Sequence, residues 1–127
     1  MKNIYFSQNV KGVVFDIGNV LVPYNENSVI DMLAPYTNNI SYESLFTLVF
    51  RSTVHLEFFM GYITPTEFYE RIRTKTNLKL TERDFFYIYN QVFQDPNQEI
   101  VNFFLQCRKA GYQIGVLSNV DRSNFYF

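Results

Sequence analysis

The sequence predicts an α/β fold in which a small parallel sheet is interrupted by a helical insertion. Two short, apolar and β-branched runs, around residues 12–17 and 112–117, have the composition of buried strands. Between them, apolar residues recur at helical spacing. Two strands are too few to form a covered parallel sheet. We therefore expect part of a larger α/β domain, with a helical module inserted after its first strand.

The first strand is expected over residues 12–17, because this run is β-branched and aromatic and a glycine bounds it at each end. Residues 20–22 are expected to continue it beyond a turn. The second strand lies in YQIGVLSN, residues 112–119, and its only available partner is the first strand.

Five helices are expected between the strands, each from a polar start signal and an apolar stripe. The strongest start is TPTE, where Thr64 is the N-cap, a proline follows, and Glu67 can reach back to the cap. Gly111 is expected to end the last helix. The remaining starts are placed at Asn27 or Ser28, Ser41, Thr81 and Asp95.

The composition excludes several classes of protein. Of the 127 residues, 47% are hydrophobic, so the chain can build a core. A net charge of -1 without a basic block argues against nucleic acid as a partner. There is no signal peptide and no stretch that could span a membrane. The single cysteine, Cys107, is expected to pack in the core, and we expect a soluble, cytoplasmic protein.

Asp16 is the first candidate for chemistry, because a carboxylate within an apolar run is costly unless it is bound or neutralised. The second strand also ends in polar groups, Ser118 and Asn119, and ligands of open α/β sheets bind at these strand ends. A carboxylate can accept a phosphoryl group as an aspartyl phosphate. Gly18 would let the backbone turn and bring its amides to an anion. Ser118 and Asn119 could hold phosphate oxygens.

Each of these signals also has a purely structural explanation. An aspartate before a glycine is common in turns, and Leu-Ser-Asn is common where strands end. The occurrence of both, on two apolar strands separated by a helical insertion, favours a site. Phosphoryl transfer there would need Mg²⁺ between carboxylate and phosphate.

Two motifs resemble those of the haloacid dehalogenase (HAD) superfamily. FDIGNVLV, residues 15–22, resembles its first motif, and GVLSN, residues 115–119, resembles its second. EFFMGYITPTEFYERI, residues 57–72, is similar to the cap of the branch with sugar-phosphate phosphatases and the N-terminal domain of bifunctional epoxide hydrolases. The resemblance extends over residues 12–124.

The resemblance implies a fold and a division of the chain. Residues 1–23 and 94–127 would form a partial HAD-type Rossmann-like parallel sheet core, without its C-terminal part. Residues 24–93 would form the inserted helical cap.

The resemblance also implies the roles of individual residues. Asp16 would be the nucleophile and a Mg²⁺ ligand, and the backbone carbonyl of Gly18 would be a second ligand. The phosphate would be bound by Ile17, Gly18, Asn19, Ser118 and Asn119.

Two departures from the family pattern affect activity. Most phosphatases of the superfamily have a second aspartate at the position of Gly18, where it protonates the leaving group. The third motif, a lysine, and the fourth, an acidic pair, should follow the second strand, but the sequence ends at Phe127 before either. We expect a truncated chain that is inactive alone and can self-associate through its open sheet.

The expected function is that of a HAD-like phosphohydrolase of small phosphorylated metabolites, sugar phosphates among them, with an aspartyl-phosphate intermediate. Arg51, His55 and Tyr62 in the cap are candidates for contact with substrate, with surface or local ion-pair roles as the alternative. A catalytically silent anion-binding or interaction module is the alternative function. A plain nucleotide-binding domain is disfavoured, because the glycine-rich fingerprint is absent.

Overall fold

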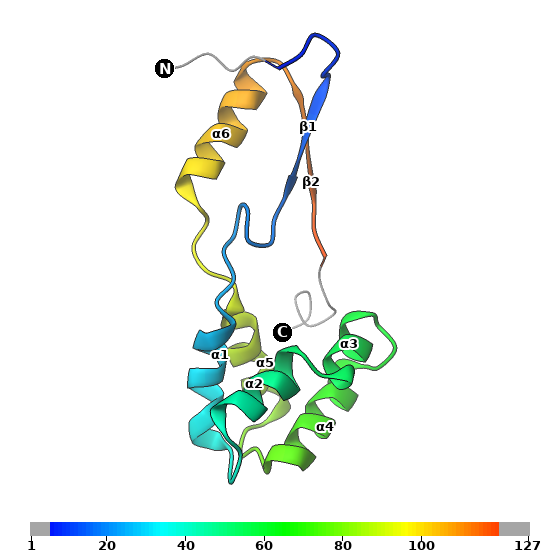
Figure 1. Ribbon diagram of the computed structural model, residues 1–127, viewed down its shortest axis with the longest axis vertical. Coiled ribbons are helices and arrows are strands. Elements are labelled where there is room, and N and C mark those ends of the chain that lie inside the picture. The colour runs from blue at the N-terminus through cyan, green and yellow to red at the C-terminus, as the bar shows by residue number, and fades with distance from the viewer. Residues whose placement is uncertain (1–5, 120–127) are drawn as a thin grey trace. The chain divides into compact units, whose positions relative to one another are not determined.

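The computed structural model of the chain describes residues 6–119, which divide into two compact units. One unit comprises residues 6–24 and 93–119, and the other comprises Asn25–Val92. Figure 1 labels the helices and strands along the chain. In order they are β1 (Gly12–Asp16), α1 (Glu26–Leu33), η1 (Ala34–Tyr36), α2 (Tyr42–Phe50), α3 (Thr53–Phe59), α4 (Pro65–Thr76), α5 (Glu82–Tyr89), η2 (Asn90–Val92), α6 (Gln98–Lys109) and β2 (Gln113–Leu117).

The first unit contains a two-stranded parallel sheet, as the sequence predicts. β1 and β2 pair in a register that places Gly12 opposite Gln113 and Asp16 opposite Leu117. Because the strands are parallel and in this register, both end at the same edge of the sheet. The predicted α/β class and the predicted partner of each strand are confirmed.

Helix α6 covers one face of this sheet (Figure 1). Phe15 of β1 is buried, and its ring centroid lies 5.1 Å from that of Phe104 and 5.9 Å from that of Phe103. Cys107, on the same helix, is fully buried, which agrees with its expected place in the core. These contacts attach α6 to β1 through aromatic packing.

The other face of the sheet is open within the described residues. Val14 and Leu117 are 69% and 70% exposed, and strand alternation places them on the face opposite Phe15. Parallel sheets are normally covered on both faces. The described sheet departs from this norm on one face.

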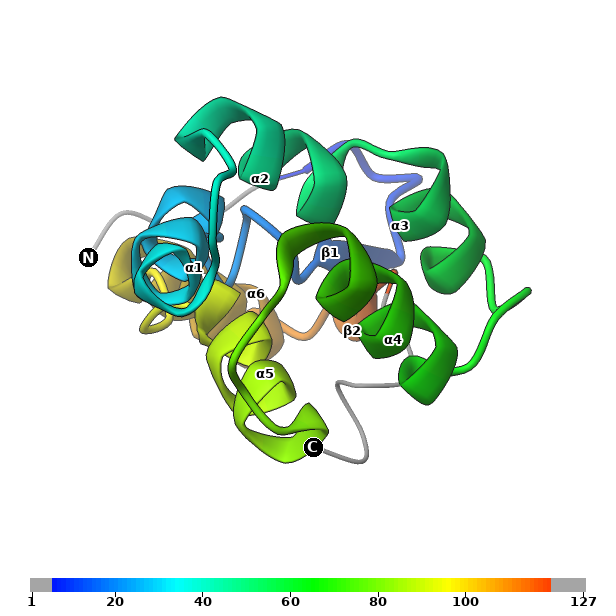
Figure 2. The same cartoon turned by 90° about the horizontal axis from the view of Figure 1, so that it is seen from below.

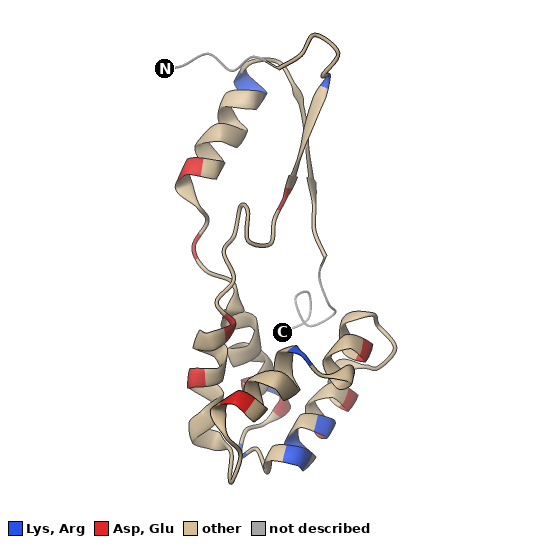
Figure 3. Ribbon diagram, in the orientation of Figure 1, with Lys and Arg blue, Asp and Glu red and all other residues tan. Residues whose placement is uncertain are grey.

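The second unit is a helical bundle of α1 to α5 (Figure 2). Its core is rich in aromatic side chains. α1 packs on α2 and α5, and α4 packs on α2, α3 and α5. Phe58 and Phe68 are buried and their rings stack with centroids 4.3 Å apart. Acidic and basic residues are interspersed over these helices (Figure 3). No helix within the described residues is long and apolar enough to cross a membrane.

Local hydrogen bonds explain most helix starts. In the predicted capping box, the Glu67 amide donates to Thr64 Oγ1 (3.1 Å) and the Thr64 amide donates to Glu67 Oε2 (2.7 Å). Ser41 and Thr81 cap α2 and α5 as predicted. Gly111 has φ +93 just after α6, in agreement with its predicted role as a stop.

Three expectations about the elements are wrong. α1 begins after Asn25, not after Asn27 or Ser28, because the Asn25 side chain accepts the amide of Ser28. α6 is capped by Asn97 rather than Asp95. Residues 20–22 form no strand and instead close a turn through an isolated bridge between Gly18 and Val22.

One helix, α3, is absent from the sequence prediction. It has only seven residues and follows α2 after Arg51 and Ser52. Its start signal is Ser52, whose Oγ accepts the amide of His55 at 3.1 Å. Because two residues separate α2 from α3, the two apolar stripes merge in the sequence.

Candidate functional site

The parallel register brings the predicted site residues of the two strands together. The Ile17 amide donates to the Leu117 carbonyl (3.3 Å), which continues the pairing one residue beyond Asp16. Asp16 is exposed at this strand end. A hollow of about 240 Å³ lies here, lined by Val14, Asp16, Leu117, Ser118 and Asn119.

A tight turn follows Asp16 and returns the chain toward β1. The Leu21 amide donates to the Asp16 carbonyl (3.4 Å), and the Asn19 amide donates to the Val22 carbonyl (2.8 Å). The residue with left-handed backbone is Asn19, with φ 56, and not Gly18. Asparagine tolerates this conformation better than most residues, because its short polar side chain can bond locally.

Gly18 is required for a different reason, the close approach of Tyr24. A Cβ atom at position 18 would lie 2.7 Å from Tyr24 Oη and 2.9 Å from its Cζ. Tyr24 is held by its own amide, which donates to Asn19 Oδ1 (2.8 Å), and by the edge of the Phe93 ring, 5.2 Å away between centroids. The ring of Tyr24 thus takes the space that a side chain at position 18 would need.

Two of the three amides expected to surround a phosphate donate within the chain. The Ile17 amide bonds Leu117, and the Asn19 amide bonds Val22. Neither bond involves the Gly18 amide. The binding roles of Ile17, Gly18 and Asn19 stay predictions.

The donor set at the hollow is suited to an ion that shares its coordination with a phosphate. Asp16 supplies the one carboxylate among the lining residues. Within residues 6–119, no group of three or more His, Cys, Asp or Glu side chains could hold a metal by itself. Mg²⁺ is usually held by one or two carboxylates together with substrate phosphates. The Asp16 carboxylate fits that pattern.

Arg51, a candidate for substrate contact, makes a local ion pair in the helical unit. Its Nη2 lies 2.7 Å from Glu26 Oε2, and its Nη1 donates to Glu26 Oε1 and to the Phe50 carbonyl. The hydrogen bond to Glu26 raises the pKa of Arg51. Its guanidinium also lies 5.3 Å from the centroid of the Phe46 ring. These contacts connect α1 to α2.

His55 and Tyr62, the other two candidates, differ in burial. His55 is half-buried, and its ring centroid lies 6.0 Å from that of Phe50 and 6.3 Å from that of Phe68. Tyr62 is 77% exposed and follows Gly61, which has φ +80. His55 therefore packs in the aromatic core, and Tyr62 is accessible at a turn.

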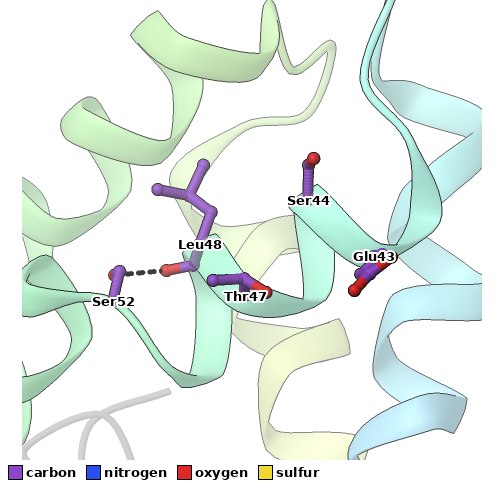
Figure 4. Close-up of a pocket in the computed structure, with 5 residues that line it drawn as sticks. All are labelled: Glu43, Ser44, Thr47, Leu48 and Ser52. Atoms are coloured by element: carbon purple, nitrogen blue, oxygen red, sulfur yellow. Dashed lines mark hydrogen bonds between the residues drawn. The ribbon is translucent and has the colours of Figure 1, made fainter.

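A second hollow lies along α2 (Figure 4). Its volume is about 370 Å³, and its lining residues are Glu43, Ser44, Thr47, Leu48 and Ser52. The Ser52 hydroxyl donates to the Leu48 carbonyl (2.6 Å), so it satisfies a carbonyl group in the last turn of α2. The sequence predicts no role for these residues.

Neither a protein-family model nor a curated protein matches the sequence. Solved structures do match the fold. One is a HAD family enzyme from Bacteroides thetaiotaomicron in complex with magnesium and inorganic phosphate, with 24% identity and a TM-score of 0.71. Another is a predicted HAD-like family hydrolase from Porphyromonas gingivalis, with 17% identity and a TM-score of 0.69.

The match extends over nearly the whole chain. The Bacteroides thetaiotaomicron alignment covers 93% of this chain and 57% of that chain, and the Porphyromonas gingivalis alignment covers 92% and 55%. The chain thus spans a little over half the length of these proteins. Over that length, it has the α/β fold of HAD family enzymes.

Proposed function

We propose that the chain is the N-terminal part of a HAD-like phosphohydrolase of small phosphorylated metabolites, sugar phosphates among them. The observation that carries this proposal is the hollow where β1 and β2 end, lined by Asp16, Ser118 and Asn119. The solved neighbour with magnesium and inorganic phosphate supports it through a shared fold.

In the proposed reaction, Asp16 acts as the nucleophile. Its carboxylate oxygen forms a bond to phosphorus while the bond from phosphorus to the ester oxygen breaks, and the leaving group departs as an alcohol after taking a proton from water. A second water then hydrolyses the aspartyl phosphate, which releases inorganic phosphate and restores the carboxylate. The Ser118 hydroxyl and the Asn119 amide donate to phosphate oxygens.

We assign Mg²⁺ to the Asp16 carboxylate and the Gly18 carbonyl. When bound, this ion would neutralise charge between the carboxylate and the phosphate. A cation is needed at this position because the Asp16 carboxylate repels a phosphate anion. The residues that line the hollow include no lysine or arginine to offset this repulsion.

We propose further that residues 1–127 alone bind phosphate without efficient turnover. One carboxylate makes a weak Mg²⁺ site, and Gly18 provides no general acid. General acid–base groups typically contribute about 10²–10⁴-fold in rate. The alternative, a catalytically silent anion-binding module, is favoured by the absence of a complete metal-ligand cluster within the described residues.

The test is a titration of the 127-residue chain with inorganic phosphate, with and without Mg²⁺. Binding is monitored through the backbone amide NMR signals of Gly18, Ser118 and Asn119. Asp16→Asn is the matched variant, because it keeps the shape and removes the charge. We expect Mg²⁺ to tighten binding in the wild type only. Without Mg²⁺, Asp16→Asn should bind more tightly, because the repulsion is removed.

Each result has a defined meaning. Phosphate binding that responds to neither Mg²⁺ nor Asp16→Asn would support the silent module instead. Absence of binding at these three amides would end both proposals. Magnesium-dependent turnover of a sugar phosphate by the wild type, lost in Asp16→Asn, would show that the 127-residue chain is active by itself.

We also propose that the chain self-associates through the open face of its sheet, since Val14 and Leu117 are exposed apolar side chains. Sedimentation velocity of the wild type should then show concentration-dependent oligomers. Val14→Lys should shift the distribution toward monomer, and equal sedimentation of the two proteins would contradict this role.

A further inference from the structure

The turn that follows Asp16 is attached to its surroundings near both of its ends. At its start, the Ile17 amide donates to the Leu117 carbonyl of β2 (3.3 Å). Near its end, the Leu21 carbonyl accepts the amide of Asn97 (2.8 Å), the residue that caps α6. Both attachments lie within the first unit. The course of the chain just after Asp16 therefore depends on the residues between them.

Asn19 reverses the chain between these two attachments. Its backbone is left-handed, with φ 56, a conformation that strains most residues but that asparagine tolerates. Around it, the Asn19 amide donates to the Val22 carbonyl (2.8 Å), and the Leu21 amide donates to the Asp16 carbonyl (3.4 Å). The backbone conformation of Asn19 is thereby linked to the backbone of Asp16, the proposed nucleophile.

The Asn19 side chain holds the same turn to the segment that follows it. Its Oδ1 accepts the Tyr24 amide at 2.8 Å. The ring of Tyr24 packs against Gly18 and meets the ring of Phe93 edge to face, with 5.2 Å between the centroids. One asparagine therefore supports the turn in two ways, through its backbone and through its side-chain acceptor.

The proposed phosphate site depends on the geometry of this turn, because Asp16 and Gly18 supply groups for phosphate and Mg²⁺. A ligand binds more weakly when the conformation that binds it is only partly populated. We propose that Asn19 is a positioning residue for the phosphate site, and that its left-handed backbone and its Oδ1 hold Asp16 and Gly18 in the arrangement that binds phosphate. This inference rests on the proposed phosphate site.

The test measures the dissociation constant of inorganic phosphate for the 127-residue chain in the presence of Mg²⁺. Asn19→Gly keeps the left-handed backbone without strain and removes the acceptor. We expect it to weaken binding about 2- to 12-fold, the range for one neutral hydrogen bond. Asn19→Ala removes the acceptor and also strains the backbone, so it should weaken binding more than Asn19→Gly. Asn19→Gly decides the test by itself if Asn19→Ala does not fold.

Asn77 provides the matched control. It also has a left-handed backbone, with φ 52, and its Oδ1 accepts the Lys79 ammonium (3.2 Å). It lies at the end of α4, in the helical unit. Asn77→Gly therefore removes the same kind of side-chain acceptor from the same backbone conformation, away from the turn after Asp16. We expect this variant to leave the dissociation constant unchanged.

Hydrogen exchange of the Leu21 and Val22 amides separates positioning from a purely structural role. These amides donate within the turn, to the carbonyls of Asp16 and Ile17 respectively. They should exchange faster in Asn19→Gly than in the wild type. Because coupling between two equilibria is reciprocal, phosphate should slow this exchange more in Asn19→Gly than in the wild type. A purely structural role predicts faster exchange at an unchanged dissociation constant.

The outcomes separate this inference from the proposed function. If Asn19→Gly binds phosphate as tightly as the wild type, the positioning role is refuted and the phosphate site stands. If Asn77→Gly weakens binding as much as Asn19→Gly, the effect is not specific to the turn and the positioning role is refuted as well. If the wild type binds no phosphate, the proposed function fails and this inference fails with it.

Discussion

Phe58 of α3 and Phe68 of α4 are stacked face to face, with ring centroids 4.3 Å apart and an interplanar angle of 7°. Both side chains are buried, and further rings surround them. This pair joins the short helix α3 to the capped helix α4. It accounts for the stability of a seven-residue helix that is too short to form alone.

Phe68→Ala should therefore destabilise the helical unit strongly. Truncation of a buried phenylalanine costs about 3–5 kcal/mol, because it removes apolar contact and leaves a cavity. Urea denaturation followed by far-ultraviolet circular dichroism measures the loss. Tyr62→Ala is the control and should change stability by less than about 0.5 kcal/mol, since its side chain is exposed.

Gly18→Ala should destabilise the first unit through its contact with Tyr24. The new Cβ would lie 2.7 Å from Tyr24 Oη, so the ring that packs against Phe93 must shift. Overpacking of this kind typically costs about 1–3 kcal/mol. A double-mutant cycle with Tyr24→Ala checks the mechanism: Gly18→Ala should cost much less in that background, and equal costs would refute the steric explanation.

Arg51→Ala should have a small effect that depends on salt. The side chains of Arg51 and Glu26 are 55% and 28% exposed, and ion pairs of this kind contribute about 0.2–1 kcal/mol. The effect should shrink at high ionic strength, because salt screens exposed charges. Arg51→Lys keeps the charge but loses the paired geometry, so it should retain only part of the stability. A loss that does not change with salt would indicate packing against Phe46 instead.

Glu67 should make the helical unit less stable in acid. Its pKa is lowered, chiefly because its carboxylate accepts the Thr64 amide in the capping box. A group with a lowered pKa contributes fully above its unfolded value, about 4.3 for glutamate, and its contribution disappears as the pH falls through the lower folded value. Glu67→Gln should flatten this acid dependence in urea denaturation at several pH values. If the free energy of unfolding of Glu67→Gln depends on pH as the wild type's does, the Glu67 carboxylate does not stabilise the helical unit through the capping box.

Cys107 should react slowly with thiol reagents in the native protein. Its side chain is fully buried, and this burial raises the pKa of its thiol. Labelling by an aromatic disulfide should become fast when urea unfolds the chain. Fast labelling under native conditions would show that α6 detaches readily from the sheet.

The start of α4 illustrates what was predictable from the sequence. Its capping box depends on side chains three residues apart, so the pattern Thr64 to Glu67 contains the whole interaction. The start of α6 was predicted two residues early, because Asp95 and Asn97 are both good caps in sequence. Only the hydrogen bonds of the Asn97 side chain decide between them.

The candidate site also contains residues that the sequence identifies and residues whose role only the structure shows. Asp16, Ser118 and Asn119 were identified because each follows an apolar run, and the hollow that they line agrees with this placement. For Arg51, the sequence offers a local ion pair beside substrate contact, and the structure shows that ion pair with Glu26, on another helix.

The sequence by itself determined the α/β class, the two strands, most helix starts and the candidate carboxylate, since periodicity and capping are local properties of the chain. Only the tertiary structure decided that Asn19 makes the turn after Asp16 and that Tyr24 closes over Gly18. The physical reason is that this contact depends on a left-handed residue and on packing against Phe93. No pattern of neighbouring residues encodes either one.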